Sequence, residues 1–401
     1  MKFVFRNYNS ATSGNDGFTL IELVVVMGIF IVVIMISAGA FEKITSHSAQ
    51  QIKSADSNIQ GIIGLEIMRS DLEHAGYGLP YVLDFVPAYD DSEVADNYLA
   101  KGINPADFND KNITAAVDAN KVPKAVQSAK ASGSAAASYE LDRDYLVIKS
   151  TFAGMNSVAK KWSYIEGTGA TSTIKLWGSA DDFVENDEVI VLNARTKALI
   201  GTSAKFSFTI PNVASSYAID AVFQPPSVTD NYLIYGIRTV TSTSTVLKFP
   251  YNRVDYYVKR PSTDSNISTR CAPNTGLLYK AVYTGGGVTS YPLLDCIADM
   301  QVIYSLDTNE DGGVDLHGNE DVLSLLSAEQ IRKQLKEIRV YVLAHDGQKD
   351  NNFNYPTSLV TVGEFGLGRV YDLTTLFPTS STEWKKFRWK VYSLVVVPKN
   401  I

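Results

Sequence analysis

Residues 17–41 of this chain read GFTLIELVVVMGIFIVVIMISAGAF and decide how the protein begins. From Leu23 to Phe41 there is no charge, and as a helix these residues would rise roughly 28 Å, near the thickness of the hydrocarbon layer of a bilayer. One acid, Glu22, stands at the start of this apolar run. A carboxylate is costly in lipid, so such a residue usually has a partner and a purpose. The stretch therefore predicts a membrane-spanning helix with a functional acid.

Two simpler explanations of this segment fit less well. A secretory signal also has a basic start, here Lys2 and Arg6, but its apolar core is shorter and its small-residue cleavage site follows the core. In this chain Gly17 precedes the apolar run. A plain transmembrane anchor accounts for the apolar run but explains neither the residues 17–20 nor Glu22.

The order of basic tract, small residue and apolar span with one acid resembles the class III signal of type IV pilins and type II secretion pseudopilins. The resemblance implies that a prepilin peptidase removes the leader 1–17 by cutting after Gly17 and methylates the new N-terminus, Phe18. It also implies a single-pass inner-membrane protein with a periplasmic C-terminal part, held in membrane lipid before assembly and later present in a pilus at the cell surface.

The resemblance gives Glu22 a role in filament register. After cleavage, the chain would begin with a positive amine on Phe18, which needs a counter-ion when helices pack in an apolar filament core. Glu22 of a neighbouring subunit supplies one, because an unpaired buried charge is strongly unfavourable while a hydrogen-bonded pair is tolerable. The partners implied are other minor and major pilins, contacted through the N-terminal helix.

Length and charge limit the remaining possibilities. More than 300 of the 401 residues lie beyond the first helix, enough for one large or two modest domains. The net charge is −7 and 20% of residues are charged, so nothing indicates nucleic-acid binding. No HExxH, GxSxG or Walker-type phosphate loop occurs. The sequence therefore predicts a protein that is not an enzyme.

The helix is expected to continue beyond the membrane, over residues 18–76 with its transmembrane half at 20–41. Gly76 and Gly78 supply the stop signals, and Gly61 and Gly64 either weaken the helix or allow close approach of a strand. Apolar residues recur every three or four positions and predict one buried face, made of Ala55, Ile59, Ile62, Ile63, Met68 and Leu72.

The rest of the chain divides into an insert and a β-rich domain. Residues 77–140 contain acidic and Ala/Ser-rich stretches and are predicted to be loop; a partner-binding insert is the alternative. Residues 141–401 are predicted to form a large antiparallel β-rich domain, because short strand patterns follow one another without long helices between them. The expected fold is thus α+β, a long N-terminal helix packed on a pilin-like domain. The expected strands are 145–148, 173–177, 188–192, 206–210, 232–235, 246–249, 254–258, 277–282, 300–304, 338–343 and 388–397.

One further helix and one cysteine pair are expected in this domain. Ser327 and Gln330 have the spacing of a capping box and predict a short helix before the strand at 338–343. Cys271 and Cys296 could form a disulfide in an oxidising periplasm, worth roughly 3 kcal/mol in the chain-entropy model, or remain two buried thiols. Their spacing does not indicate redox catalysis or zinc.

Four segments carry a second resemblance, to the PilW family of minor pilins: residues 68–78, 297–315, 335–340 and 387–400. The resemblance implies a low-abundance pilin that primes or caps pilus assembly. It does not extend to residues 80–260. A J-type pseudopilin of type II secretion, usually shorter, and a pilus-tip adhesin are the alternatives.

An acidic loop is the one candidate ligand site. Asp307, Asn309, Asp311 and Asp315 occupy positions one, three, five and nine of an EF-hand-type calcium loop, with glycine at position six. Position twelve is Gly318, where a bidentate Glu is expected. The loop is predicted to bind Ca²⁺, and an Asp/Asn/Gly-rich turn without metal is the alternative.

Overall fold

The computed structural model describes residues 19–87, 122–130, 143–211, 219–241, 244, 246–248, 251–260, 267–284 and 288–401; within the long helix, the side chains at 46, 47, 49, 50 and 52–60 are not described. The chain divides into two compact units, Met1–Lys53 and Ser54–Ile401, and each is considered by itself. The leader 1–17, which ends at Gly17, and the following Phe18 lie outside the described residues. So do the acidic residues near position 90 of the predicted loop.

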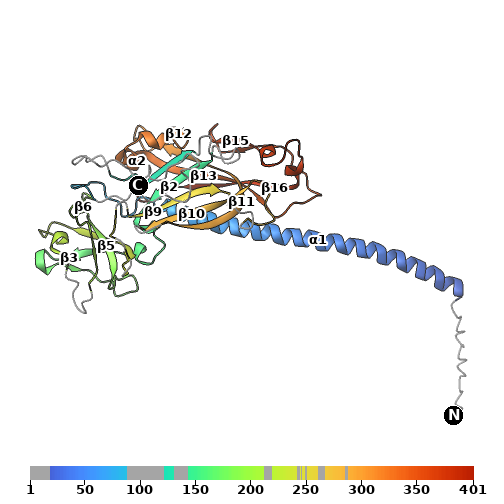
Figure 1. Cartoon of the computed structure of the whole chain (residues 1–401), viewed down its shortest axis with the longest axis horizontal. Coiled ribbons are helices and arrows are strands. Elements are labelled where there is room, and N and C mark those ends of the chain that lie inside the picture. Colours follow the sequence, from blue (N-terminus) through green and yellow to red (C-terminus); the bar gives the residue numbers. More distant parts are fainter. Residues whose placement is uncertain are drawn as a thin grey trace, which may run out of the picture. The chain divides into compact units, whose positions relative to one another are not determined.

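The long helix predicted at the N-terminus is present as α1 (Leu20–Glu73) (Figure 1). Its first part, Leu20–Thr45, has a mean hydropathy of 2.9 and is long and apolar enough to cross a membrane. No proline interrupts the helix. The span is four residues longer than the expected 20–41, because Glu42 and Lys43 fall within it without ending the apolar run.

Glycines end α1 as the sequence predicts. Gly76 and Gly78 have φ values of +82° and +71°, a left-handed conformation that glycine adopts without a steric penalty. The N–H of Gly76 donates to the carbonyl of Lys149 at 3.0 Å, so the chain leaves the helix hydrogen-bonded to a strand of the domain. The turn thus fixes the end of α1 to the β-structure.

Half of the described strands form one antiparallel sheet of eight strands (Figure 1). Every pairing in it is antiparallel, so the predicted fold class, a long apolar helix followed by a large antiparallel β-rich domain, is confirmed. β12 (Leu316–Gly318) pairs with β11. The remaining strands follow in spatial order as β1 (Val126–Lys130), β2 (Asp144–Lys149), β9 (Asn252–Lys259), β10 (Gly276–Thr284), β11 (Val288–Leu306), β13 (Leu335–Asp346) and β16 (Arg388–Val396).

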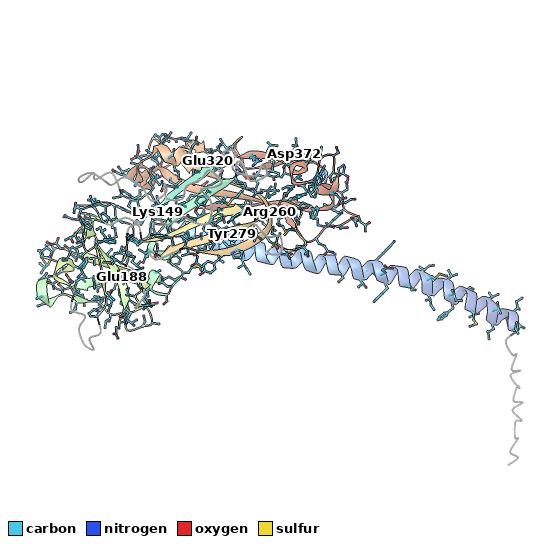
Figure 2. The ribbon with its side chains drawn as sticks, viewed as in Figure 1. Lys149, Glu188, Arg260, Tyr279, Glu320 and Asp372 are labelled. Carbon is cyan, nitrogen blue, oxygen red and sulfur yellow. A yellow bond between two sulfur atoms is a disulfide. The ribbon has the colours of Figure 1, made fainter. Side chains whose placement is uncertain are left out.

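Residues from the unrecognised middle of the chain form a second sheet with a core of its own. Its order is β4 (Thr173–Ile174), β3 (Trp162–Glu166), β8 (Tyr232–Thr239), β5 (Asp187–Asn193) and β6 (Leu199–Ile200), with β7 (Ser207–Thr209) paired to β5. Glu188 on β5 marks this sheet in Figure 2 and binds Arg238 of β8 at 2.8 Å. A separate hydrophobic cluster fills it, including Phe183, Phe223 and Ile234. A two-stranded sheet, β14 (Leu359–Val362) with β15 (Arg369–Asp372), completes the strands.

Strand β13, which lies between β11 and the edge strand β16, is buried on both of its faces. Ile338, Val340 and Val342 point into the cluster shared with the end of α1, while Tyr341 and Leu343 point into a second cluster that includes both buried tryptophans. Alternate residues of a strand point to opposite faces, so a nearly continuous apolar run is the pattern of a strand covered on both sides. The run at 338–343 therefore lies between the two hydrophobic clusters.

The buried face of α1 differs from the predicted one. Met68 and Leu72 are fully buried, but Ile62 and Ile63 are 63% and 57% exposed. Gly61 and Gly64 lie at the contact instead, and a side chain on Gly64 would stand 3.2 Å from the carbonyl oxygen of Leu293. The alternative reading of these glycines, close approach of a strand, is the one that the structure shows, and this approach leaves the isoleucines on the outside.

Of three local predictions, one is confirmed and two are wrong. The helix capped by Ser327 is present as α2 (Ala328–Gln334) with both hydrogen bonds of the capping box, and it leads directly into β13. The loop expected over 77–140 is wrong at β1, where residues of low β-propensity gain a full ladder with β2. The strand expected at 246–249 is wrong over the described residues 246–248, which form no strand although Leu247 is buried.

Candidate functional site

Thr19 and Glu22 form a hydrogen-bonded pair at the start of α1, where the described part of the chain begins. The backbone N–H and the hydroxyl of Thr19 donate to Oε2 of Glu22 at 2.9 and 3.0 Å, and the N–H of Glu22 approaches the Thr19 hydroxyl at 3.4 Å. This is a capping box, in which a Thr and a Glu three residues later satisfy the free N–H groups of the first turn. The Thr-x-x-Glu spacing in the sequence is the signal for this capping role, which adds to the predicted role of Glu22 as a counter-ion.

A buried ion pair ties the end of α1 to the large sheet. Asp71 Oδ2 lies 2.6 Å from Nζ of Lys280 on β10 and accepts a hydrogen bond from the hydroxyl of Tyr256 on β9 at 2.5 Å. All three side chains are buried. Loss of hydration raises the pKa of Asp71, although Lys280 and Tyr256 oppose the shift. The helix is thus fixed by charge as well as by apolar packing.

The C-terminal segment contacts the same end of α1. Lys399 pairs with Glu73, its N–H donates to the carbonyl of Glu73 at 2.9 Å, and Arg69 reaches the carbonyl of Val395 at 3.3 Å. The pKa of Glu73 is lowered, mainly by the hydrogen bond from Lys399. Because β11 pairs with β13 and β13 with β16, residues 68–78, 297–315, 335–340 and 387–400 meet in one part of the fold.

The two cysteines are joined. Cys271 and Cys296 form a disulfide with a Cα–Cα distance of 4.8 Å, the first of the two alternatives that the sequence left open. His345 lies beside it, and its Nε2 accepts a hydrogen bond from the N–H of Ala272 at 2.8 Å. Burial and nearby Arg270 lower the pKa of His345 to about 3. Since both sulfurs are bonded to each other, these residues offer no thiolate pair to a metal.

A group of buried charges beside β11 was not anticipated from the sequence. The Nε of Arg143 donates to the carbonyl of Ala298 at 2.9 Å, and the carboxylate of Asp144 accepts the N–H of Val302 at 2.6 Å. Burial raises the pKa of Asp144 well above its usual value, and it raises that of Asp299 to about 6 against the opposing effect of two arginines. Polar residues alternating with apolar ones at 297–302 were the available signal.

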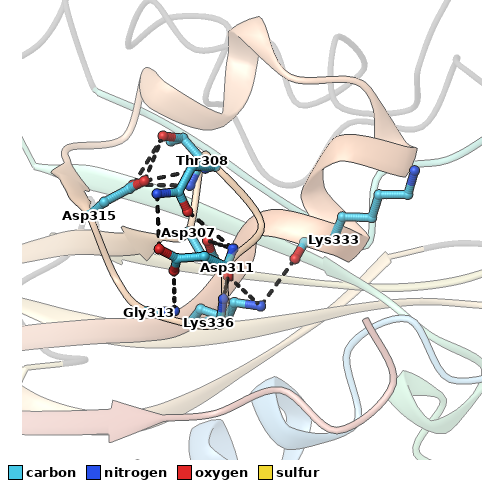
Figure 3. Close-up of polar contacts among 9 residues, drawn as sticks. Asp307, Thr308, Asp311, Gly313, Asp315, Lys333 and Lys336 are labelled. Carbon is cyan, nitrogen blue, oxygen red and sulfur yellow. Dashed lines mark hydrogen bonds and ion pairs between the residues drawn. The ribbon is translucent and has the colours of Figure 1, made fainter.

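The acidic loop joins β11 to β12 and is organised by its own carboxylates (Figure 3). Asp307 accepts the N–H groups of Asp311 and Gly312 at 3.0 and 2.9 Å. Asp311 accepts the N–H of Gly313 and the side-chain amide of Asn309, at 2.8 and 3.1 Å. These contacts are those of consecutive Asp/Asn turns.

Asp315 closes the loop, and Lys336 supplies a positive charge to it. Asp315 accepts the N–H of Thr308 at 2.9 Å and both of its oxygens contact the Thr308 hydroxyl, so the pKa of Asp315 is lowered. Lys336 Nζ lies 3.1 Å from Oδ2 of buried Asp307 (Figure 3). Burial opposes the shift, yet Lys336 and two backbone N–H groups lower the pKa of Asp307.

The carboxylates of this loop are already satisfied by hydrogen bonds and by Lys336, so the loop geometry does not require a metal. Among the described residues, Cys271, Cys296 and His345 have potential metal-ligand atoms within 4.8 Å of one another. The described acidic side chains of the loop do not form such a group. The ammonium group of Lys336 lies beside Asp307, where a bound cation would otherwise neutralise the carboxylate. Calcium binding by Asp307, Asn309, Asp311 and Asp315 stays a prediction.

Comparison with known proteins bears on the N-terminal segment. Residues 12–38 match the prokaryotic N-terminal methylation motif. No curated protein and no solved structure matches the chain. The motif and the apolar helix together indicate a membrane-anchored protein of pilin or pseudopilin type. Such a motif implies processing by a prepilin peptidase and assembly with other pilins.

Proposed function

We propose that this protein is a minor pilin of the PilW type, which primes or caps a type IV pilus after cleavage behind Gly17. The observation that carries the proposal is the methylation motif at residues 12–38, followed by an apolar helix that continues into a folded β-rich domain. The meeting of the four PilW-like segments at the end of α1 supports it, because the part that resembles that family is then one structural unit.

In this proposal Glu22 has two partners in the filament. In the single chain its Oε2 caps the first turn through Thr19, which keeps the carboxylate hydrogen-bonded. In the filament it also neutralises the N-terminal amine of a neighbouring subunit. A carboxylate that retains its capping bonds while it accepts the amine is better satisfied than one that relies on the amine alone.

The test compares Glu22→Ala with Glu42→Ala, a matched acid-to-alanine change farther along the same helix. Both variants are expected to be processed, with N-methylated Phe18 as the first residue by mass spectrometry. Glu22→Ala should then be at least tenfold depleted in sheared pili, whereas Glu42→Ala should not. Normal incorporation of Glu22→Ala would refute the register role, and a chain that retains Met1 would refute the prepilin assignment.

The J-type pseudopilin of type II secretion remains the alternative machine for the same anchor. Immunogold labelling of sheared filaments and the secretion of exoproteins in a deletion strain separate the two. Labelled filaments with normal secretion support the pilus, and a secretion defect without labelled filaments supports the pseudopilin.

A second candidate function, adhesion at the pilus tip, is favoured by one observation. Residues 162–239 of the middle of the chain form a sheet with a core of its own. Since β1, β2 and β9 belong to the large sheet, a test deletion must spare them, so residues 157–240 are replaced by a short Gly/Ser linker. Normal piliation with lost attachment would support adhesion, and lost piliation would instead assign this sheet to assembly.

A further inference from the structure

The outer face of the ribbon formed by β3 and the segment after β4 carries three aromatic side chains. Trp162 and Tyr164 alternate along β3 with buried Ser163 and Ile165, so both point away from the core. Trp177 follows β4 and is 43% exposed, and Trp162 is 45% exposed. We call Trp162, Tyr164 and Trp177 the aromatic face. Large aromatic side chains left in water need an explanation, because burying them is strongly favourable.

The rings of the aromatic face are held in place before any ligand arrives. The centroids of Trp162 and Trp177 lie 5.3 Å apart, and those of Tyr164 and Trp177 lie 5.8 Å apart. The indole N–H of Trp177 donates to the carbonyl of Trp162 at 3.1 Å. The carboxylate of Asp182 accepts the backbone N–H groups of Trp177 and Gly178, at 2.5 and 2.9 Å. A ligand would therefore bind without ordering these side chains first.

Polar groups lie beside the rings. Glu166 continues the outward row of β3, and Lys175 lies 3.3 Å from it, with both side chains more than one third exposed. The Tyr164 hydroxyl approaches Glu166 at 3.4 Å. The face thus combines apolar ring surface with a carboxylate and an ammonium group.

We propose that the aromatic face is a carbohydrate-binding site. A pyranose ring presents C–H groups on its faces and hydroxyls around its edge, so it needs ring surface to stack on and donors and acceptors beside that surface. Trp162, Tyr164 and Trp177 provide the first, and Glu166 and Lys175 provide the second. The proposal gives a ligand class to the adhesive function suggested for the second sheet, and it does not depend on the pilus assignment.

The size and charge of the face argue against a protein partner. Three partly exposed aromatic side chains offer about 300 Å² of contact, far below the roughly 800 Å² that each partner contributes to a stable protein interface. A protein that covered the face would also desolvate the Glu166–Lys175 pair, and desolvation can outweigh the attraction between the charges. Sugar hydroxyls instead hydrogen-bond to both groups.

The test uses the full chain in detergent and a defined panel of probes: soluble tetra- to hexasaccharides of glucose, galactose and N-acetylglucosamine. Binding is measured by isothermal titration calorimetry. Trp162→Ala should weaken binding at least tenfold, and Trp162→Ala/Trp177→Ala should abolish it. Trp162→Phe keeps a stacking ring and should retain more affinity than Trp162→Ala. Tyr291→Ala is the matched control, because Tyr291 is 40% exposed on β11 of the other sheet, and it should bind as the unaltered chain does.

Several outcomes would overturn the proposal. These are no heat with any probe at 10 mM, equal loss of binding in Tyr291→Ala, or unchanged binding in the double variant with native circular dichroism. Loss of piliation in the double variant without any sugar binding would assign the face to a protein contact. If sugar binding is lost while cells carrying the double variant still attach, the site stands and the adhesive function fails.

Discussion

Replacing Lys280 by methionine is expected to destabilise the β-rich unit strongly at neutral pH. Methionine keeps most of the apolar volume of lysine but removes the ammonium group that lies 2.6 Å from Asp71. The exposed fractions of the two side chains are 7% and 5%, so water cannot replace the lost partner. Breaking a buried ion pair from one side costs about 3–5 kcal/mol, because the other charge remains buried and uncompensated.

The cost should depend on pH in a direction that the structure fixes. Burial already raises the pKa of Asp71 above its usual 3.8, and Lys280 is the main group that opposes the shift. Without Lys280 the pKa rises further, so the folded variant takes up a proton more readily than the unfolded chain does. Its stability is therefore recovered as the pH falls through the raised pKa toward 3.8, by about 1.4 kcal/mol per pH unit in that range.

Urea unfolding of the full chain in mild detergent measures this, with the fluorescence of buried Trp384 and Trp389 as the probe. The double variant Asp71→Asn/Lys280→Met should be more stable than Lys280→Met alone, since no charge is left buried. A cost below about 1 kcal/mol at pH 7, or a cost that stays constant between pH 7 and pH 4, would refute the reasoning.

Three further predictions concern the rest of the β-rich unit. Cys296→Ala should lower the free energy of unfolding by about 3 kcal/mol and make it insensitive to reducing agent, as urea unfolding with and without reductant will show. Asp299, with a folded pKa of about 6, adds stability as the pH falls from 6 to 3.8, so unaltered protein should gain about 3 kcal/mol over Asp299→Asn between pH 7 and pH 3.5 in the same assay. Calcium at the acidic loop competes with Lys336, so calorimetry in chelator-treated buffer should show millimolar-range binding that tightens in Lys336→Gln; heat in neither protein would contradict it.

Patterns that depend on neighbours along the chain predicted their elements well. The capping box at Ser327 and Gln330, the glycine stops after α1 and the run at 338–343 each depend on a few consecutive residues, and each is present in the structure. Partners distant in sequence were harder to foresee. β1 is a strand because β2 pairs with it, and nothing in the Ala/Ser-rich sequence around residue 128 indicates that ladder.

The same distinction applies to the candidate sites. The anchor is contiguous in sequence, so the motif, the apolar span and Glu22 could all be identified from it. The Asp71–Lys280 pair joins residues more than two hundred positions apart, and a lone aspartate in a helix gives no sign of a buried partner. The aromatic face was missed because the pattern at Trp162–Glu166 was not recognised as a strand, and without that strand its tryptophans have no common face.

The close approach of Gly61 and Gly64 to the sheet has a practical consequence for anyone who purifies this protein. Because the glycines occupy the contact, Ile62 and Ile63 remain exposed to water. They lie a few residues after the point where a truncation would remove the membrane-spanning segment. A truncated protein that begins at Ser54 would expose both isoleucines and is expected to self-associate through them. Exchanging both isoleucines for glutamine should yield a monodisperse sample with its melting temperature unchanged.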